Sequence, residues 1–151
     1  MTSSELPRVL FLCSGNYYRS RFAEELFNHC ASAEGVPYRA DSAGLLPVCQ
    51  THNVGPMSAF AIEGLKERGV PLPALLRLPR DVTEEDLRSA AITIAVKEVE
   101  HRPLVSSRFP AWAERVEFWH VDDVGDAPPR VALPLLEHGV RELLVRLGAA
   151  R

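Results

Sequence analysis

A short apolar run that leads through a glycine-containing loop into a helix restricts the fold of this chain most strongly. Residues Arg8–Leu12 are typical of a buried strand, and the segment after the loop places Phe22, Leu26 and Cys30 on one helical face. A second apolar run, Ala90–Val96, is typical of a central strand. Apolar strands that alternate with helices predict a parallel sheet covered by helices on both faces.

The rest of the chain continues this alternation. We expect a second strand over 36–40, closed by a turn at 41–44, and a further strand over 116–121. One helix is expected to start near Pro56 and to end at Gly69, and its inner stripe consists of Met57, Phe60, Ala61 and Leu65. A short helix is expected to start at Thr83, which begins a capping pattern. A closing helix is expected over 131–147. No internal repeat or composition shift marks a boundary, so residues 1–151 are expected to form one domain.

Composition excludes several classes of protein. Hydrophobic residues make up 46% and charged residues 25%, and the net charge is only −3 with scattered basic residues, so we expect no nucleic-acid partner. No apolar run approaches the roughly 20 residues that span a bilayer, and no secretory signal precedes the first strand, so we expect no membrane association. Three scattered cysteines favour a reducing cytoplasm over a disulfide framework and form no metal-binding pattern.

The loop after the first strand carries the chemistry. Cys13 is followed six positions later by Arg19, with Gly15 and Asn16, two residue types that readily adopt positive φ, between them. The free N–H groups at the start of the following helix would attract an oxyanion and favour the Cys13 thiolate over the thiol. Arg19 can clamp two phosphate oxygens, and the Ser20 hydroxyl can donate to the Cys13 sulfur. The alternative is a buried cysteine in an ordinary strand-to-helix turn.

The segment from Val9 to Ser20 resembles the signature of the low-molecular-weight protein tyrosine phosphatase family. The Asp-Ser-Ala-Gly sequence at 41–44 and the segment 55–70 resemble further landmarks of that family. The resemblance implies a flavodoxin-like three-layer α/β/α fold with a four-stranded parallel sheet, a phosphocysteine intermediate on Cys13, and no cofactor or metal. It implies a phosphorylated partner, either a phosphotyrosine protein or a small aryl phosphate. It also implies that Asn16, Ser20 and Ser42 share a hydrogen-bond network that supports the loop; the alternative for Ser42 is a turn residue that caps its own backbone. Substrate would bind to the loop residues Ser14, Gly15, Asn16, Tyr17, Tyr18 and Ser20.

The general acid departs from the family pattern. An Asp followed by Pro is expected about a hundred residues after the cysteine, but no Asp-Pro occurs there in this chain. Alignment of the sequence Val-Asp-Asp-Val favours Asp123, and Asp122 and Asp126 remain alternatives; any of the three is also consistent with a solvated turn.

Other departures concern the substrate. Tyr18 stands where many members have a second cysteine. Aromatic residues of the cleft are replaced by the segment 45–48, and the tyrosines that follow the acid are replaced by Val124 and Gly125. Tyr17 is then a candidate stacking wall, or it packs on the surface. The family's histidine near the middle of the chain has no evident match over 72–80. Three alternatives to a phosphatase stay open. The first is an anion-binding module on the same fold. The second is an arsenate reductase, which needs two further thiols, but no cysteine follows Cys49; the third is a phosphocysteine carrier, and Arg19 argues against it.

Overall fold

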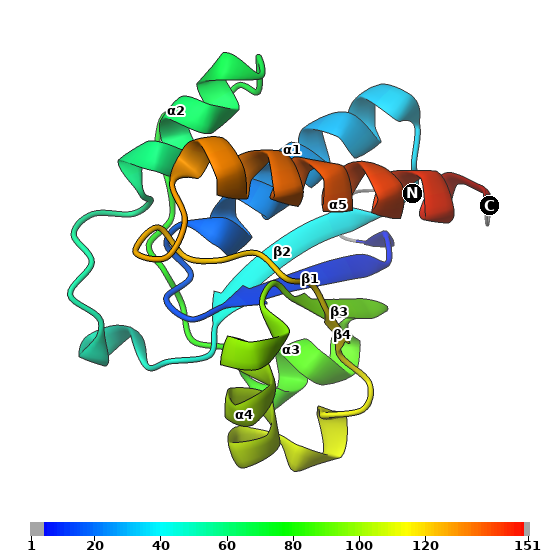
Figure 1. Cartoon of the computed structure of the whole chain (residues 1–151). Helices are drawn as coiled ribbons and strands as arrows, with labels where there is room; N and C mark the ends of the chain where they lie inside the picture. Colours follow the sequence, from blue (N-terminus) through cyan, green and yellow to red (C-terminus); the bar gives the residue numbers. More distant parts are fainter. Residues whose placement is uncertain (1–4, 150–151) are drawn as a thin grey trace.

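A computed structural model describes residues 5–149, which form a four-stranded parallel sheet between two helical layers (Figure 1). The strands lie in the order β2-β1-β3-β4. They span Arg8–Cys13 (β1), Arg39–Gly44 (β2), Ile92–Ala95 (β3) and Glu117–Phe118 (β4). β1 pairs with both β2 and β3, so it lies inside the sheet. The predicted flavodoxin-like α/β/α fold is confirmed.

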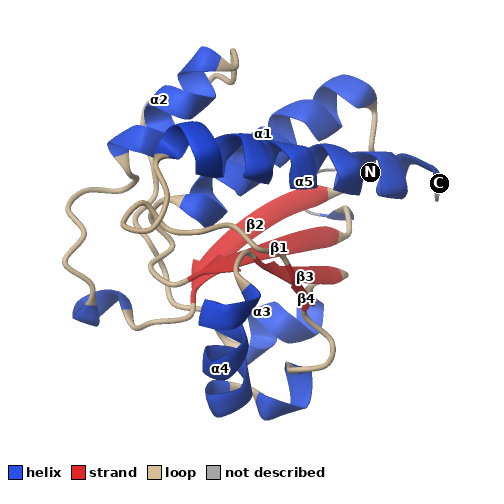
Figure 2. Ribbon diagram, in the orientation of Figure 1, coloured by secondary structure: helices blue, strands red, loops and turns tan. Residues whose placement is uncertain are grey.

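Helices cover the two faces of the sheet separately (Figure 2). α1, α2 and α5 lie on one face, and α3 and α4 lie on the other. Their bounds are Arg19–Glu34 (α1), Ala59–Glu67 (α2), Glu84–Ser89 (α3), Glu98–Arg108 (α4) and Pro129–Ala149 (α5). Two short 3-10 turns, Val48–Gln50 (η2) and Pro110–Trp112 (η3), complete the elements of the described chain.

The side chains of β1 alternate between two hydrophobic cores. Phe11 and Cys13 belong to the core beneath α1 and α5, whereas Leu10 and Leu12 belong to the core beneath α3 and α4. This alternation follows from the two-residue period of a strand. The ring of Phe11 lies 6.1 Å from that of Phe27 and 5.7 Å from that of Trp119. The nucleophile candidate is therefore anchored at the end of the most buried strand.

The second strand lies later in the chain than the sequence predicted. The turn expected at 41–44 is instead the body of β2, and Asp41 and Gly44 stand in register with Leu10 and Cys13 of β1. Pairing with a buried strand here overrides the turn preference of Asp, Ser and Gly. A Cβ added to Gly44 would lie 3.1 Å from the Ser14 carbonyl oxygen, so this strand end approaches the loop closely.

Three other elements differ from expectation. No pattern in the sequence indicated α4, which begins at Glu98, shortly after β3, and contains Pro103. β4 is shorter than predicted and includes only Glu117–Phe118. α2 begins at Ala59, where the Ser58 side chain caps it, and Phe60 is 51% exposed instead of lying on the inner stripe. Among residues 5–149, no helix combines the length and apolarity needed to cross a bilayer.

Candidate active site

The candidate site lies at the carboxyl edge of the sheet, between the ends of β1 and β3. Cys13 is the last residue of β1, and α1 begins only six residues later at Arg19. The chain leaves β1 toward the face of α1 and leaves β3 toward the face of α4. Open α/β sheets bind ligands at such a divergence of two neighbouring strands.

The backbone of the loop 14–18 has the features of an anion-binding loop. None of its backbone N–H groups donates a hydrogen bond to another residue within the described range 5–149. Asn16 adopts a positive φ of 51°, which turns the loop tightly before α1. Successive free N–H groups next to a helix N-terminus form a concavity of positive potential.

Asn16 holds the loop through its fully buried side chain. Its amide nitrogen donates to Ser20 Oγ at 2.9 Å and to Ser42 Oγ at 2.8 Å. The Cys13 sulfur lies 2.9 Å from Ser20 Oγ. When the sulfur is a thiolate, the Ser20 hydroxyl is the donor, so this network stabilises the nucleophilic form. The structure thus brings Cys13, Asn16, Ser20 and Ser42 together in one hydrogen-bonded network.

Two arginines that the sequence did not indicate complete this network. Arg77 Nη1 donates to Asn16 Oδ1 at 2.9 Å, and Arg77 Nη2 contacts Ser42 Oγ at 2.8 Å and Glu24 Oε1 at 2.9 Å. The backbone N–H of Arg80 donates to the same Asn16 oxygen at 3.1 Å. Arg77 lies in the stretch 72–80. The sequence showed no partner for the loop there, because no local pattern distinguishes Arg77 from the other arginines of the chain.

Arg19 is 1% exposed, and its guanidinium is held on two sides. Nη1 donates to the Val121 carbonyl oxygen at 2.9 Å, and Nη2 donates to Glu100 Oε2 at 2.6 Å. Burial disfavours the charge, but Cys13 and Glu100 outweigh this effect and raise the pKa of Arg19 above its ordinary value. Arg19 is therefore a permanent cation next to the loop.

A cavity of about 190 Å³ opens above Cys13. Its wall contains three aromatic side chains: Tyr17, Tyr18 and Phe60. The Tyr17 hydroxyl donates to the Val54 carbonyl oxygen at 2.6 Å, which fixes the ring. The remaining lining residues are Gly15, Arg19, Asn53, Ser58, Asp123 and Val124. Phe60 therefore supplies an aromatic wall, although the aromatic residues expected in the family's cleft are replaced in this chain.

Of the three candidate acids, Asp123 lines this cavity, and its Oδ2 lies 3.6 Å from Arg19 Nη2. Asp122 instead forms an ion pair with Lys97, and Asp126 is exposed and contributes its backbone N–H to the turn that follows Asp123. Neither Asp122 nor Asp126 is among the residues that line the cavity. The carboxylate of Asp123 is therefore the one positioned to meet a group bound over Cys13.

Tyr18 and Ser14, the remaining loop residues, face different surroundings. Tyr18 is 5% exposed, packs edge-on against Phe60, and its buried hydroxyl has no hydrogen-bond partner among the described residues. Burial and the nearby Asp123 raise the pKa of Tyr18, so it remains a neutral phenol. Ser14 turns toward α4, where its hydroxyl donates to Glu100 Oε2.

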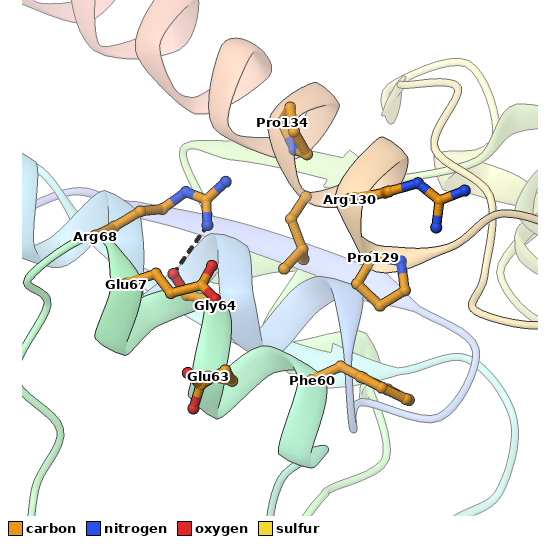
Figure 3. A pocket seen from close by; sticks show the side chains of 9 residues that line it. Phe60, Glu63, Gly64, Glu67, Arg68, Pro129, Arg130 and Pro134 are labelled. Atoms are coloured by element: carbon orange, nitrogen blue, oxygen red, sulfur yellow. Dashed lines mark hydrogen bonds between the residues drawn. The ribbon is translucent and has the colours of Figure 1, made fainter.

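A second cavity of about 300 Å³ lies between α2 and α5 (Figure 3). Phe60 lines both cavities, but neither Cys13 nor Arg19 lines this one. Its wall includes Glu63, Glu67 and Arg130, and Arg68 donates to the Gly64 carbonyl oxygen at 2.9 Å. It is therefore distinct from the cavity above Cys13. Within residues 5–149, no group of three His, Cys, Asp or Glu side chains is arranged to hold a metal ion.

Known proteins with the same architecture identify the family. Residues 8–128 match the family model described as low molecular weight phosphotyrosine protein phosphatase. A protein-arginine-phosphatase of Bacillus subtilis (strain 168) is 32% identical over 108 residues, which are 72% of this chain and 67% of that protein.

Two solved structures show the same fold. The crystal structure of a low molecular weight protein tyrosine phosphatase from T. tengcongensis aligns with a TM-score of 0.74 and 28% identity, covering 96% of this chain and 99% of that one. YfkJ from Bacillus subtilis aligns with a TM-score of 0.82 and 23% identity, covering 97% and 98%. Given the match over residues 8–128 and the arrangement of the cysteine loop, this chain belongs to the low molecular weight phosphotyrosine protein phosphatase family.

Proposed function

We propose that this chain is a phosphomonoester hydrolase of the protein-tyrosine-phosphatase type that carries the phosphoryl group on Cys13. The observation that supports this most directly is that Cys13, Arg19 and Asp123 line one cavity. A nucleophile, a cation for the transferred group and a proton donor are the three groups that the reaction needs.

In the first step, the Cys13 thiolate attacks phosphorus and the bond from phosphorus to the leaving oxygen breaks. Protonated Asp123 gives its proton to that oxygen, so the alcohol or phenol leaves neutral. The loop amides of 14–18 and Arg19 stabilise the charge on the three remaining phosphoryl oxygens. The products are a phosphocysteine and the Asp123 carboxylate.

In the second step, the Asp123 carboxylate takes a proton from water, which attacks phosphorus as the P–S bond breaks. The Ser20 hydroxyl, 2.9 Å from the sulfur, stabilises the departing thiolate. Inorganic phosphate leaves, and both Cys13 and Asp123 return to their starting states. The chain's own residues supply every charge and proton in this scheme, so we propose no cofactor and expect a chelator to leave the rate unchanged.

The aromatic wall of the cavity supports a planar leaving group, of which phosphotyrosine or another aryl phosphate is our first candidate. Phosphoarginine is the second, because the 32% identical Bacillus subtilis relative is named as a protein-arginine-phosphatase. A guanidinium group is also planar, and the Asp123 carboxylate could bind its charge. Comparing kcat/KM on one peptide carrying either phosphotyrosine or phosphoarginine distinguishes the two candidates.

We further propose that the protein works in the cytoplasm. Cys13, Cys30 and Cys49 are all free thiols in the structure, and the reaction needs Cys13 reduced. The proposed partner is a phosphorylated protein or small aryl phosphate.

The test of the nucleophile is Cys13→Ser, assayed with p-nitrophenyl phosphate. The serine hydroxyl has no adjacent base, so turnover should be lost while phosphate binding remains. A variant that kept more than about a tenth of the wild-type kcat, which is a barrier change below about 1.4 kcal/mol, would contradict the assignment. A wild-type protein that binds phosphate without any turnover would instead indicate the anion-binding module.

A further inference from the structure

Glu100, in the first turn of α4, contacts the catalytic loop without lining the cavity. Its Oε2 atom accepts hydrogen bonds from Arg19 Nη2 at 2.6 Å and from the Ser14 hydroxyl. Oε2 also lies 2.7 Å from His101 Nε2. Since Glu100 is not among the lining residues, its carboxylate holds Arg19 from outside the substrate site.

His101 fixes the orientation of Glu100. The imidazole is fully buried, and its Nδ1 accepts the backbone N–H of Lys97 at 3.1 Å. In the neutral ring, the single proton therefore lies on Nε2, which donates to Glu100. Burial lowers the pKa of His101, and this effect prevails over the neighbouring carboxylate, so the neutral tautomer is the resting form. A backbone N–H at the start of α4 is thus linked through His101 to the carboxylate that holds Arg19.

The contacts of Arg19 leave part of its guanidinium for substrate. One N–H of Nη1 donates to the Val121 carbonyl oxygen, and one N–H of Nη2 donates to Glu100. An arginine side chain carries five N–H donors, so these two bonds do not use them all. Arg19 also lines the cavity above Cys13. The two anchors therefore fix the plane of the guanidinium while the other donors remain available to phosphoryl oxygens.

We propose that Glu100, oriented by His101, is a positioning residue that holds the guanidinium of Arg19 in its catalytic orientation before substrate binds. This inference rests on the proposed phosphatase function and adds a residue to its machinery. Preorganised charge stabilises a transition state without a cost of reorientation at the moment of reaction.

A carboxylate so close to the loop also has an effect opposite to that of positioning Arg19. The two effects predict changes of opposite direction in kcat when the charge of Glu100 is removed. The negative charge of Glu100 reduces the attraction of the site for phosphate. If Glu100 influenced the reaction only through this field, Glu100→Gln would strengthen phosphate binding and raise the rate. If Glu100 positions Arg19, the same change lowers kcat and weakens a transition-state mimic such as vanadate more than it weakens phosphate.

The experiment compares kcat for p-nitrophenyl phosphate and inhibition by vanadate and phosphate in four proteins. Glu100→Gln should lower kcat at least about tenfold and weaken vanadate inhibition by a similar factor. Glu100→Asp keeps the charge but is one methylene shorter, and it should retain an intermediate rate. The matched control is Glu98→Gln, from the same helical turn. The carboxylate of Glu98 lies 2.7 Å from the Arg102 guanidinium and does not contact the loop. Its kcat should stay within about twofold of wild type.

A double-mutant comparison tests whether Glu100 acts through Arg19. In an Arg19→Lys background the planar partner is gone, so Glu100→Gln should change the residual kcat by less than about twofold. A merely structural role would give the full loss in both backgrounds, and that result would overturn the proposal. An active wild-type enzyme with unchanged or raised kcat in Glu100→Gln would also overturn it while leaving the phosphatase assignment intact. A wild type as inactive as Cys13→Ser would overturn both.

Discussion

Replacing Asn16 by alanine removes the side chain that fixes the shape of the loop 14–18. The buried amide uses its full hydrogen-bonding capacity, because its nitrogen donates to Ser20 and Ser42 and its oxygen accepts from Arg77 and the Arg80 backbone. Its φ of 51° is also a conformation that asparagine tolerates better than alanine does. The substitution therefore affects both the contacts of the loop and its backbone.

The size of the loss follows from these contacts. Each of the four hydrogen bonds contributes about 1 kcal/mol net, and alanine at positive φ costs about 1 kcal/mol more. Ser42 and Arg77 keep Glu24 as a partner, which offsets part of the loss. We expect the free energy of unfolding to fall by about 3–5 kcal/mol, a large fraction of the total for a domain of this size.

The assay is urea unfolding combined with kcat measured on folded protein. The matched control is Asn28→Ala, whose amide exchanges two hydrogen bonds with the backbone of Ala40 at 3.1 and 2.7 Å, far from Cys13. Asn28→Ala should cost about 1–2 kcal/mol and leave kcat unchanged. In contrast, Asn16→Ala should lower kcat at least about tenfold, because the loop amides lose their alignment. A loss below about 1 kcal/mol for Asn16→Ala, at equal denaturant slope, would refute this account of the loop.

Two further predictions concern carboxylates. Asp123→Asn should slow phenyl phosphate far more than p-nitrophenyl phosphate, because the poorer leaving group needs the proton; equal losses on both substrates would exclude Asp123 as the acid. Burial opposes the charge of Asp86, but hydrogen bonds from Arg80 and Thr83 outweigh it and lower the pKa of Asp86 below its ordinary 3.8. Ionised Asp86 thus stabilises the fold at neutral pH, and this contribution is lost as pH falls through the folded-state value. The difference in unfolding free energy between wild type and Asp86→Asn should therefore shrink between about pH 5 and pH 2, and a constant difference would contradict the assignment.

The sequence alone was sufficient for the elements whose pattern is local. β1, the loop and α1 are contiguous, so the apolar run, the Gly-Asn pair and the helical stripe together predicted a strand, an anion loop and a helix. The capping box at Thr83 was also predicted, because it depends on residues only three positions apart. The same locality misled at 41–44, where turn-forming residues are paired in a strand by the neighbouring β1.

The partners of the loop were decided by tertiary structure. Arg77 reaches Asn16 from 61 positions away, and Glu100 reaches Arg19 from 81 positions away. Neither residue lies in a local pattern that distinguishes it from other charged residues. Likewise, the exposure of Phe60 depends on how α2 sits beside α5 and the cavity, and its helical periodicity did not reveal this.

Tertiary structure also distinguishes the three candidate aspartates. Asp122, Asp123 and Asp126 are equivalent in the sequence as carboxylates of one loop. The short β4 ends before them, and the direction in which the chain leaves the sheet brings Asp123 to Arg19 while Asp122 pairs with Lys97. The carboxyl ends of parallel strands lie at one edge of the sheet because each crossover helix packs on a face of the sheet and returns the chain to the opposite edge. The residues that share the site are therefore set by long-range packing, whereas the proposed nucleophile and its loop are set by the sequence of one strand, turn and helix.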